Sequence, residues 1–377
     1  MGKRDANGVC VICVVTVFLS FFLLIQFRWE FPKLQDLPSA EFRQLFGQSS
    51  SSDAIRRSAQ EDNTSTTQTR IFYNYNEKEL LARYQLSSTL DLDSLAVIPG
   101  LASTLSFNSW GGTPTVSHAM VSQGIAVSDA WIFISAYDGN YVANSVIYMI
   151  SRSDGKLQKT IILQGQPHVG GLAYDNRNDR LWIATRKDKK AQLVGISLRK
   201  LKSYPNGSTN PITYDFEVSL PKLKRASFIE YYGGSLYVGF FDTASNGVMY
   251  RFKLTSLGRL TEQEAQHPTS RYVILPQVQG VAITSDRIFF SQSYGGGASV
   301  LYVFENKGGG DYAAKDPLAK TQVPAMMEDI TVYDGILYAA YESAAANYRE
   351  KYGVGIDRIV TYPLESIPAA LTQEGGQ

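Results

Sequence analysis

Cysteine and histidine are scarce in this chain of 377 residues, which holds two cysteines and three histidines. Both cysteines, Cys10 and Cys13, lie in one apolar run near the N-terminus, so the rest of the chain has no disulfide and no cysteine–histidine metal cluster. On an apolar segment such a pair is typical of small buried side chains or of a palmitoylation site, and redox or metal chemistry is the less favoured interpretation.

Short catalytic motifs are also missing. There is no Gly-x-Ser-x-Gly elbow, no His-Glu-x-x-His zinc motif and no phosphate-binding loop. The net charge is +1, from 36 Lys or Arg and 35 Asp or Glu, so no overall positive field attracts polyanions, and nucleic acid is not expected as a partner. An active site assembled from distant residues is still compatible with the sequence.

One long apolar run is present, at 9–27. It is uncharged and about as long as a helix that crosses a bilayer. Because no small-residue cleavage site follows it closely, a transmembrane signal anchor is favoured over a cleaved signal peptide. The sequence therefore predicts a single-pass membrane protein, with the lipid bilayer as the partner of 9–27 and residues 1–8 as a short cytoplasmic tail. The charges on both sides of the run, Lys3 and Arg4 before it and Arg28 after it, leave the orientation open.

Residues 28–69 are predicted to be a juxtamembrane segment and a flexible stalk, because 48–69 are rich in Ser, Thr, Gln and Asp and poor in apolar residues. The folded domain is expected at 70–377, outside the cell or in the secretory lumen. The sequons at Asn63 and Asn206 predict glycosylation, which such a location would allow.

From residue 124 onward one phrase recurs: a small or polar residue, an apolar strand, a turn, a second apolar strand and a third that often carries a Tyr. The five copies begin at Gly124, Gly171, Ser227, Gly280 and Asp329. Their spacing of about 50 residues is typical of the blades of a β-propeller.

The number of blades depends on the residues before the first copy. Residues 70–86 have the pattern of an outer hairpin, and the segments 95–98 and 101–107 could be two degenerate inner strands. We therefore expect an all-β fold, a β-propeller with six blades favoured over five, in which the N-terminal segment completes the last blade so that the ring has no free edge.

The phrases Val169-Gly-Gly-Leu-Ala-Tyr-Asp and Gln123-Gly-Ile-Ala-Val-Ser resemble those of the NHL and gluconolactonase-like propellers, over residues 124–364. The resemblance implies the fold, because such propellers include lactonases, esterases, ligand binders and scaffolds. Gluconolactonase-type members hold calcium with several acidic oxygens at the channel mouth. This chain has only Glu328 and Asp329 there, so no cofactor is expected, and calcium stays the open alternative.

Polar residues just before the inner strands of a propeller converge at one mouth of the central channel. Aligning the copies places Gln123, Gln279 and Glu328 at equivalent positions. The candidate ligand-binding residues are His118, Gln123, His168, Arg225, Gln279 and Glu328. No catalytic residue and no metal ligand is assigned.

Two further features lie near this mouth. Residues at the ends of the second strands form a second rim of aromatic and charged side chains, which suits sugar or cation recognition or packing between blades. Its members are Tyr137-Asp138, Arg186-Lys187, Phe241-Asp242, Ser293-Tyr294 and Tyr341-Glu342. The sector 177–225 has 12 Lys or Arg against 4 Asp or Glu, so anionic glycans or lipid head groups are possible partners there.

The sequence thus favours a binding module that uses the channel mouth for a polar ligand or a protein segment. The enzymatic alternative is a metal-dependent lactonase or esterase, with Glu328 and nearby carbonyls on the metal and His168 or His118 as general base. A scaffold that uses the blade rims is the third class.

Overall fold

The computed structural model describes residues 65–71, 95–352 and 355–367, which all belong to one compact unit, Ser49–Gln377. Among these residues no helix is both long and apolar enough to span a bilayer. The predicted membrane helix at 9–27, the sequon at Asn63 and most of the predicted hairpin at 70–86 lie outside the described residues.

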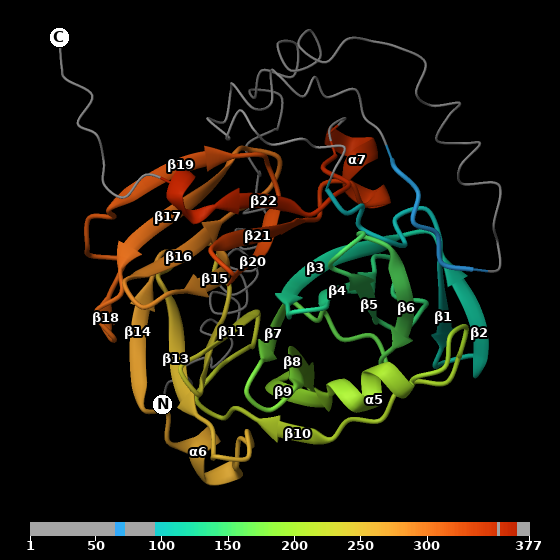
Figure 1. Cartoon of the computed structure of the whole chain (residues 1–377), viewed down its shortest axis with the longest axis horizontal. Helices are drawn as coiled ribbons and strands as arrows, with labels where there is room; N and C mark the ends of the chain where they lie inside the picture. The colour runs from blue at the N-terminus through green and yellow to red at the C-terminus, as the bar shows by residue number, and fades with distance from the viewer. Residues whose placement is uncertain (1–64, 72–94, 353–354, 368–377) are drawn as a thin grey trace, which may run out of the picture. The chain divides into compact units, whose positions relative to one another are not determined.

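The predicted β-propeller is confirmed: antiparallel sheets are arranged radially around a central axis (Figure 1). Blade 1 contains β3 (Met120–Val127), β4 (Trp131–Asp138), β5 (Val146–Ser151) and β6 (Leu157–Ile162). Blade 2 contains β7 (Gly171–Asp175), β8 (Arg180–Lys187), β9 (Lys190–Ser197) and β10 (Phe216–Ser219). Blade 3 contains β11 (Phe228–Tyr232), β12 (Ser235–Gly239), β13 (Gly247–Lys253) and β14 (Ser270–Ile274), with the short β18 (Gly310–Asp311) alongside.

Blade 4 contains β15 (Val278–Ile283), β16 (Arg287–Gln292), β17 (Ser299–Glu305) and β19 (Ala319–Val323), and blade 5 contains β20 (Met327–Tyr333), β21 (Ile336–Tyr341) and β22 (Val360–Pro363). The first strand of each blade lines the axis, and β3 is buried along its whole length. The core is divided into five apolar clusters, and each lies between two neighbouring blades. Burial of both sheet faces explains the nearly continuous apolar strands.

The expectation of six blades is wrong, because five inner strands already close the ring. Blade 5 adjoins blade 1 directly: the Ser122 hydroxyl donates to the Tyr341 carbonyl at 2.6 Å, and the Ile125 N–H donates to Asp329 at 3.0 Å. The residues expected to supply a sixth inner pair are used elsewhere. Thr104–Asn108 (β1) pairs instead with Thr113–Ser117 (β2) in a separate hairpin.

Glycines permit so tight a ring. A Cβ atom on Gly124 would lie 2.7 Å from the Leu172 nitrogen, and one on Gly171 would lie 2.6 Å from the Phe228 Cα. Both distances are too short for a real contact, so the backbones of adjacent inner strands meet where any other residue would hold them apart.

The N-terminal segment joins the edge of blade 5, as ring closure requires. Val97 and Arg358 form an antiparallel bridge, the Ile98 N–H donates to the Asp357 carbonyl at 2.9 Å, and the Ile359 N–H donates to the Ala96 carbonyl at 2.9 Å. Residues 65–71 then run beside blade 1, where the Gln68 amide donates to the Gly155 carbonyl at 2.6 Å.

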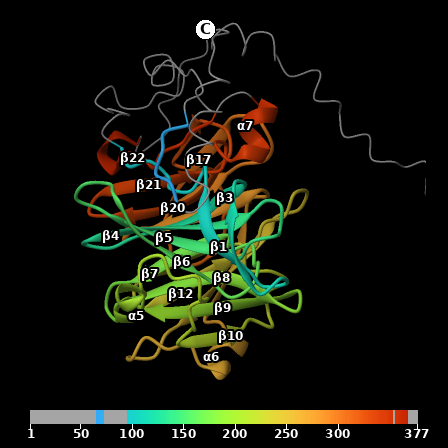
Figure 2. The same cartoon turned by 90° about the vertical axis from the view of Figure 1, so that its right-hand side faces the viewer.

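Short helices lie between the strands. These are α5 (Leu198–Ser203), α6 (Glu262–Gln266), α7 (Ala346–Tyr352) and the 3-10 turn η3 (Leu364–Ser366). Figure 2 shows α7 and α6 at opposite ends of the view. Because α7 follows β21, it belongs to the end of the channel at which the inner strands begin, which we call the mouth.

Candidate functional site

Three inner strands are irregular at equivalent points next to the mouth. The pairing register shifts, as at a β-bulge, between Ser122 and Ile125, between Val278 and Gly280, and between Met327 and Ile330. The residues in these gaps include Gln123, Gln279 and Glu328. A bulge re-aims the side chains of the extra residues, so the irregular backbone turns these three polar groups toward a common point.

The common point is a pair of carboxyl groups on blade 5. Glu328 and Glu342 share a side-chain hydrogen bond. The Gln279 amide donates to Glu328 Oε1 at 3.1 Å, and the Gln123 amide donates to Glu342 Oε2 at 2.9 Å. Gln123 and Glu328 are buried, whereas Gln279 and Glu342 are half-buried and line the opening. The structure therefore brings together three of the six candidate residues.

Burial changes the protonation of this pair. Desolvation, the charge of Glu342 and the nearby Asp329 raise the pKa of Glu328 well above its usual range. Desolvation also raises the pKa of Glu342, to about 7, against hydrogen bonds from Glu328, Gln123 and Tyr348 that lower it. Because two adjacent carboxylates cannot both ionise in a poorly solvated site, the pair keeps a shared proton at neutral pH.

A line of aromatic side chains continues from Glu342 across the mouth. Tyr348, on α7, hydrogen bonds to Glu342 and to Tyr137. Burial, followed by the neighbouring Tyr348 and Glu342, raises the pKa of Tyr137, so its phenol stays protonated. The rings of Tyr137 and His168 lie 4.4 Å apart, and Tyr141, half exposed, packs on Tyr137 at 5.6 Å.

His168 lies at the cationic end of this line. His168 is exposed to solvent at its surface, although many protein atoms surround its ring. Desolvation first, and then the charges of Arg186 and Arg225, lower the pKa of His168 to about 4. The imidazole is therefore neutral at physiological pH and offers one donor and one acceptor.

The backbone entering three inner strands is strained. Val169, Gln277 and Met326 adopt φ values of 51°, 62° and 63°, and each comes just before the mouth end of an inner strand. A β-branched residue such as Val is a rare occupant of this region. Such strain tends to occur at functional sites, and here it lies next to the residues that carry the site, His168, Gln279 and Glu328.

The other predicted residues are placed differently. Arg225 is exposed at the rim, and its guanidinium donates to the Phe241 carbonyl at 3.1 Å. His118 bonds to the Ala102 carbonyl at 2.8 Å, and no contact joins it to the carboxyl pair among the described residues. Asn206 is exposed in the turn after α5, and its glycosylation stays a prediction.

The second rim divides into two kinds of residue. Phe241 and Tyr294 contact each other with ring centroids 6.1 Å apart and tilted planes, as expected for packing between blades. Asp138 is buried and accepts from the Val142 and Ala143 N–H groups, so it holds its own loop instead of facing a ligand. Asp242 likewise accepts from the loop that follows it.

Below the mouth the channel contains two more buried carboxyl groups. Asp329 accepts from the Ile125 and Leu172 N–H groups at 3.0 and 3.2 Å, which ties blades 1, 2 and 5 together. Glu230 accepts from the Thr331 hydroxyl at 3.0 Å. Desolvation raises the pKa of both, and these side chains form the structural floor of the mouth.

Metal ligands are not gathered at the mouth. The described part of the chain contains no cluster of three or more His, Cys, Asp or Glu side chains that could hold an ion. The carboxyl pair itself supplies oxygen ligands from only two residues, fewer than the six to eight oxygens that calcium prefers.

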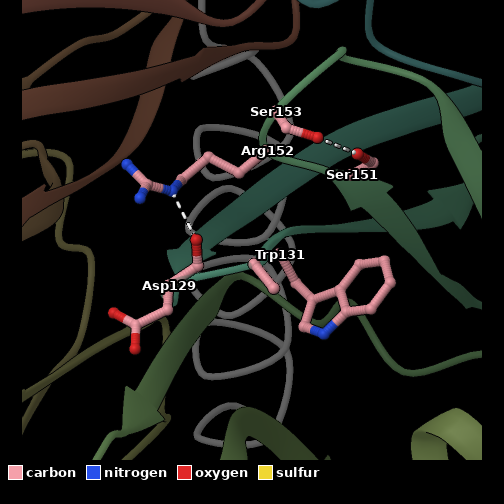
Figure 3. Close-up of a pocket in the computed structure, with 6 residues that line it drawn as sticks. Asp129, Trp131, Ser151, Arg152 and Ser153 are labelled. Atoms are coloured by element: carbon pink, nitrogen blue, oxygen red, sulfur yellow. Dashed lines mark hydrogen bonds between the residues drawn. The ribbon is translucent and has the colours of Figure 1, made fainter.

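A recess of about 580 Å³ lies away from the mouth, at the opposite end of blade 1 (Figure 3). The turn after β3 and the turn after β5 line it. Figure 3 shows Arg152 reaching to the main chain at Asp129, with a bond of 2.8 Å to that carbonyl, while Trp131 points the other way. Arg152 also lies over the Tyr333 ring at 5.0 Å. Tyr333 ends β20 at the far end of the channel, so this recess is distinct from the polar cluster at the mouth.

Two central residues are not among the six candidate ligand-binding residues: Glu342, which the sequence places only in the second rim, and Tyr348. A usable signal existed for Glu342. It follows the second strand of the same hairpin whose first strand carries Glu328, and Met327 pairs with Tyr341. In an antiparallel hairpin the start of one strand lies beside the end of the next, so the two Glu residues had to be neighbours. Tyr348 lies on a helix that the repeat pattern does not predict.

No family model and no curated protein matches the chain. Similar solved structures include hydrazine synthase of Kuenenia stuttgartiensis, with 11% identity, a TM-score of 0.37 and coverage of 60% of this chain and 56% of that one. A nidogen–laminin complex has 15% identity, a TM-score of 0.37 and coverage of 60% and 76%. A putative oxidoreductase (glucose dehydrogenase) of Thermus thermophilus has 17% identity, a TM-score of 0.36 and coverage of 60% and 77%.

The chain thus spans just over half of the hydrazine synthase chain. The resemblance to the NHL and gluconolactonase-like propellers holds at the level of the fold, which the arrangement of blades establishes on its own.

Proposed function

We propose that this chain is a membrane-anchored β-propeller that binds a small polar ligand at the mouth of its channel, outside the cell or in the secretory lumen. The observation that carries the proposal is the convergence of Gln123, Gln279, Glu328 and Glu342 from three blades onto one opening. Burying polar groups costs free energy, and apolar side chains at the same positions would avoid that cost. A functional role therefore explains these polar residues better than stability does.

The geometry suits a ligand with hydroxyl groups. Glu342 and Gln279 are partly accessible and offer acceptors and donors, while the exposed rings of His168 and Tyr141, which both contact the buried Tyr137, offer aromatic faces. Convergent polar groups next to aromatic faces are what sugar-like molecules need for orientation and stacking. Anchoring by residues 9–27 would hold this mouth near a membrane surface.

Saturation-transfer NMR on the purified full-length chain tests the proposal. The probes are glucose, sorbitol, gluconate and glucose 6-phosphate. We expect at least one to bind, and we expect Glu342→Ala and the nearly isosteric Tyr348→Phe to abolish or strongly weaken that binding without loss of folding. Glu365→Ala, an exposed glutamate of η3, is the matched control. The proposal fails if no probe binds or if both mouth variants bind like the wild type.

Hydrolysis is a second candidate, and the proton shared by Glu328 and Glu342 favours it. A carboxyl group with a pKa near 7 can act as general acid or base at physiological pH. A lactonase or esterase would hydrolyse δ-gluconolactone or p-nitrophenyl acetate, and Glu342→Gln would remove that activity. If calcium raises the melting temperature and a chelator reverses the effect, the metal-dependent form of this alternative gains support.

A further inference from the structure

The cations of the basic sector, 177–225, fall into three groups in the folded chain. Some hold the structure: Lys200 pairs with Asp215 at 2.6 Å, and the Arg180 guanidinium lies over the Phe216 ring at 4.4 Å. Three exposed cations, Arg177, Arg199 and Lys202, lie at the other end of blade 2, after β7 and on α5. The remaining cations are exposed at the rim of the mouth, around the β8–β9 turn and in the loop before β11. The exposed rim cations are Arg186, Lys187, Lys189, Lys190, Lys222, Lys224 and Arg225.

Two of the rim cations, Arg186 and Arg225, act on the same imidazole. Both flank the segment that carries His168, because Gly171 pairs with Ala184, two residues before Arg186, and a Cβ atom on Gly170 would lie 2.3 Å from the carbonyl oxygen of Ser227, two residues after Arg225. After desolvation, their charges lower the pKa of His168. None of the ion pairs found among the described residues includes either arginine. Hydrogen bonds from the Ser245 and Ala244 N–H groups lower the pKa of Asp242, and the charges of Lys224 and Arg225 lower it further. The Asp242 carboxylate is therefore already bound by its own loop.

The mouth is therefore polarised. Its side on blades 2 and 3 presents two arginines with a neutral histidine, and its side on blade 5 presents Glu342 with Gln279 nearby on blade 4. Tyr137 spans the interval, since its ring contacts that of His168 at a tilt and its hydroxyl bonds to Tyr348, which in turn bonds to Glu342. Positive charge at one end and hydroxyl-binding groups at the other favour a ligand that has an anionic group at one end and hydroxyl groups at the other.

We propose that the ligand of this mouth is a small hydroxylated anion, of the sugar phosphate or sugar acid class, whose oxyanion is bound by Arg186 and Arg225. The planar guanidinium donates paired hydrogen bonds that match a phosphate or a carboxylate. Glu342 and Gln279 bind hydroxyl groups at the other end, and the exposed rings of His168 and Tyr141, which both contact the buried Tyr137, pack against the body of the ligand. This inference rests on the proposed function, to which it adds the charge of the ligand.

A lipid head group could present the same oxyanion. The recessed position of Glu342, which is half-buried beneath α7, favours a free small molecule. The test is arranged so that the two sources give different results.

The test follows the imidazole NMR signals of the full-length chain in phosphatidylcholine nanodiscs. The chain has only three histidines, so a His168→Gln variant assigns the signal. The ligands form two matched pairs, glucose with glucose 6-phosphate and sorbitol with gluconate. We expect the anionic member of each pair to bind at least tenfold more tightly and to raise the pKa of His168 by about one unit, because its charge offsets the arginines.

Arg186→Gln and Arg225→Gln are each expected to weaken anion binding by about 10- to 100-fold, the loss of one charge-assisted contact. Arg199→Gln is the control. It makes the same charge change in the same sector, but it lies on α5, at the far end of β9 from the rim. It should leave the affinity unchanged.

The outcomes separate the two claims. Equal affinity for the anionic and the neutral member of each ligand pair overturns this inference, but it does not affect the proposed function. Failure of all four ligands overturns both. A His168 response that appears only when phosphatidylglycerol replaces phosphatidylcholine, and not with the soluble anions, overturns the small-molecule ligand in favour of a membrane surface.

Discussion

Asp329 holds three blades together with one side chain. Its Oδ2 atom accepts from backbone N–H groups of blades 1 and 2, and it belongs to blade 5. Water cannot reach backbone donors that are buried in the core, so loss of this acceptor leaves the Ile125 and Leu172 N–H groups without a hydrogen bond. The residue therefore acts as a structural tie below the mouth.

We expect Asp329→Ala to lower the free energy of unfolding by about 2–5 kcal/mol, the cost of two unpaired buried donors. Asp329→Asn keeps an acceptor oxygen and should lose less than half as much. Burial raises the pKa of this carboxyl, which favours its uncharged form, and the amide imitates that form. Chemical denaturation measures both variants, and equal losses would show that the tie depends on charge instead of on the acceptor.

Glu342 makes stability depend on pH. Its pKa is raised in the folded chain to about 7, so the folded state binds a proton that the unfolded chain has released. The stability gained in this way is fully present below the unfolded value of about 4.3 and is lost as pH rises through 7. His168 works in the opposite direction, since its lowered pKa costs stability as pH falls below about 6.5.

Glu342→Gln isolates the first of these effects. The difference in melting temperature between variant and wild type should grow in favour of the variant between pH 5 and pH 8, because the amide cannot ionise. Thermal melts at four pH values measure it. Glu365→Gln, at an exposed position, should keep the wild-type dependence. A constant difference between Glu342→Gln and wild type would contradict the shared proton.

At the scale of the strand, close backbone contact determines how many blades fit. The inner strands β3, β7 and β11 meet through glycines, and a methyl group at Gly171 would overlap backbone atoms of blade 3. Backbone cannot rotate away as a side chain can, so the strands themselves would have to separate.

Gly171→Ala should accordingly destabilise the chain by about 1–3 kcal/mol, the usual cost of overpacking, in spite of the lower entropy of the unfolded alanine chain. Gly297→Ala is the matched control, because its Cβ would enter open space. We expect that variant to melt within about a degree of the wild type. Equal tolerance at the two sites would mean that the ring is looser than its contacts indicate.

Much of this architecture could be read from the sequence, and the reason is physical. Strand pairs such as β7 and β8 are continuous apolar runs separated by a turn, and that pattern survives without tertiary information. The positions of Gln123, Gln279 and Glu328 could be read for the same reason, since each lies within an inner strand, close before its regular apolar stretch.

What the pattern could not supply were features fixed by closure of the ring. Six blades were expected because 95–98 and 101–107 are apolar enough for inner strands. Yet Val97 bridges to blade 5, and Leu105 pairs in the β1–β2 hairpin. The partnership of Glu328 with Glu342 depends on bulges whose position no local pattern specifies. The site was therefore predicted by blade but not by contact.

At the scale of the whole molecule, the ring differs from an open array of repeats. In an open array the terminal repeats have one neighbour and fray, whereas a closed ring has no terminal repeat. Here blade 5 contacts blade 1 directly, and the junction is reinforced by bonds between the N-terminal segment and residues 357–359, just before β22, and by the burial of Ile98 against the core. Breaking the bonds of the N-terminal segment should weaken the junction between blades 5 and 1 and favour conversion of the ring into an array with two ends there.

Ile98→Pro tests this conversion, because proline removes the N–H that donates to Asp357 while leaving the rest of the segment in place. Ile98→Ala is the matched variant, since it loses the buried side chain but keeps the donor. We expect hydrogen exchange in the proline variant to accelerate most in β22 and β3, at the two new ends, and least in β13 of blade 3. Ile98→Ala should raise exchange rates by less and more evenly. If the proline variant exchanged uniformly faster across all blades, closure would contribute only to global stability, and the ring would unfold as a unit even when opened.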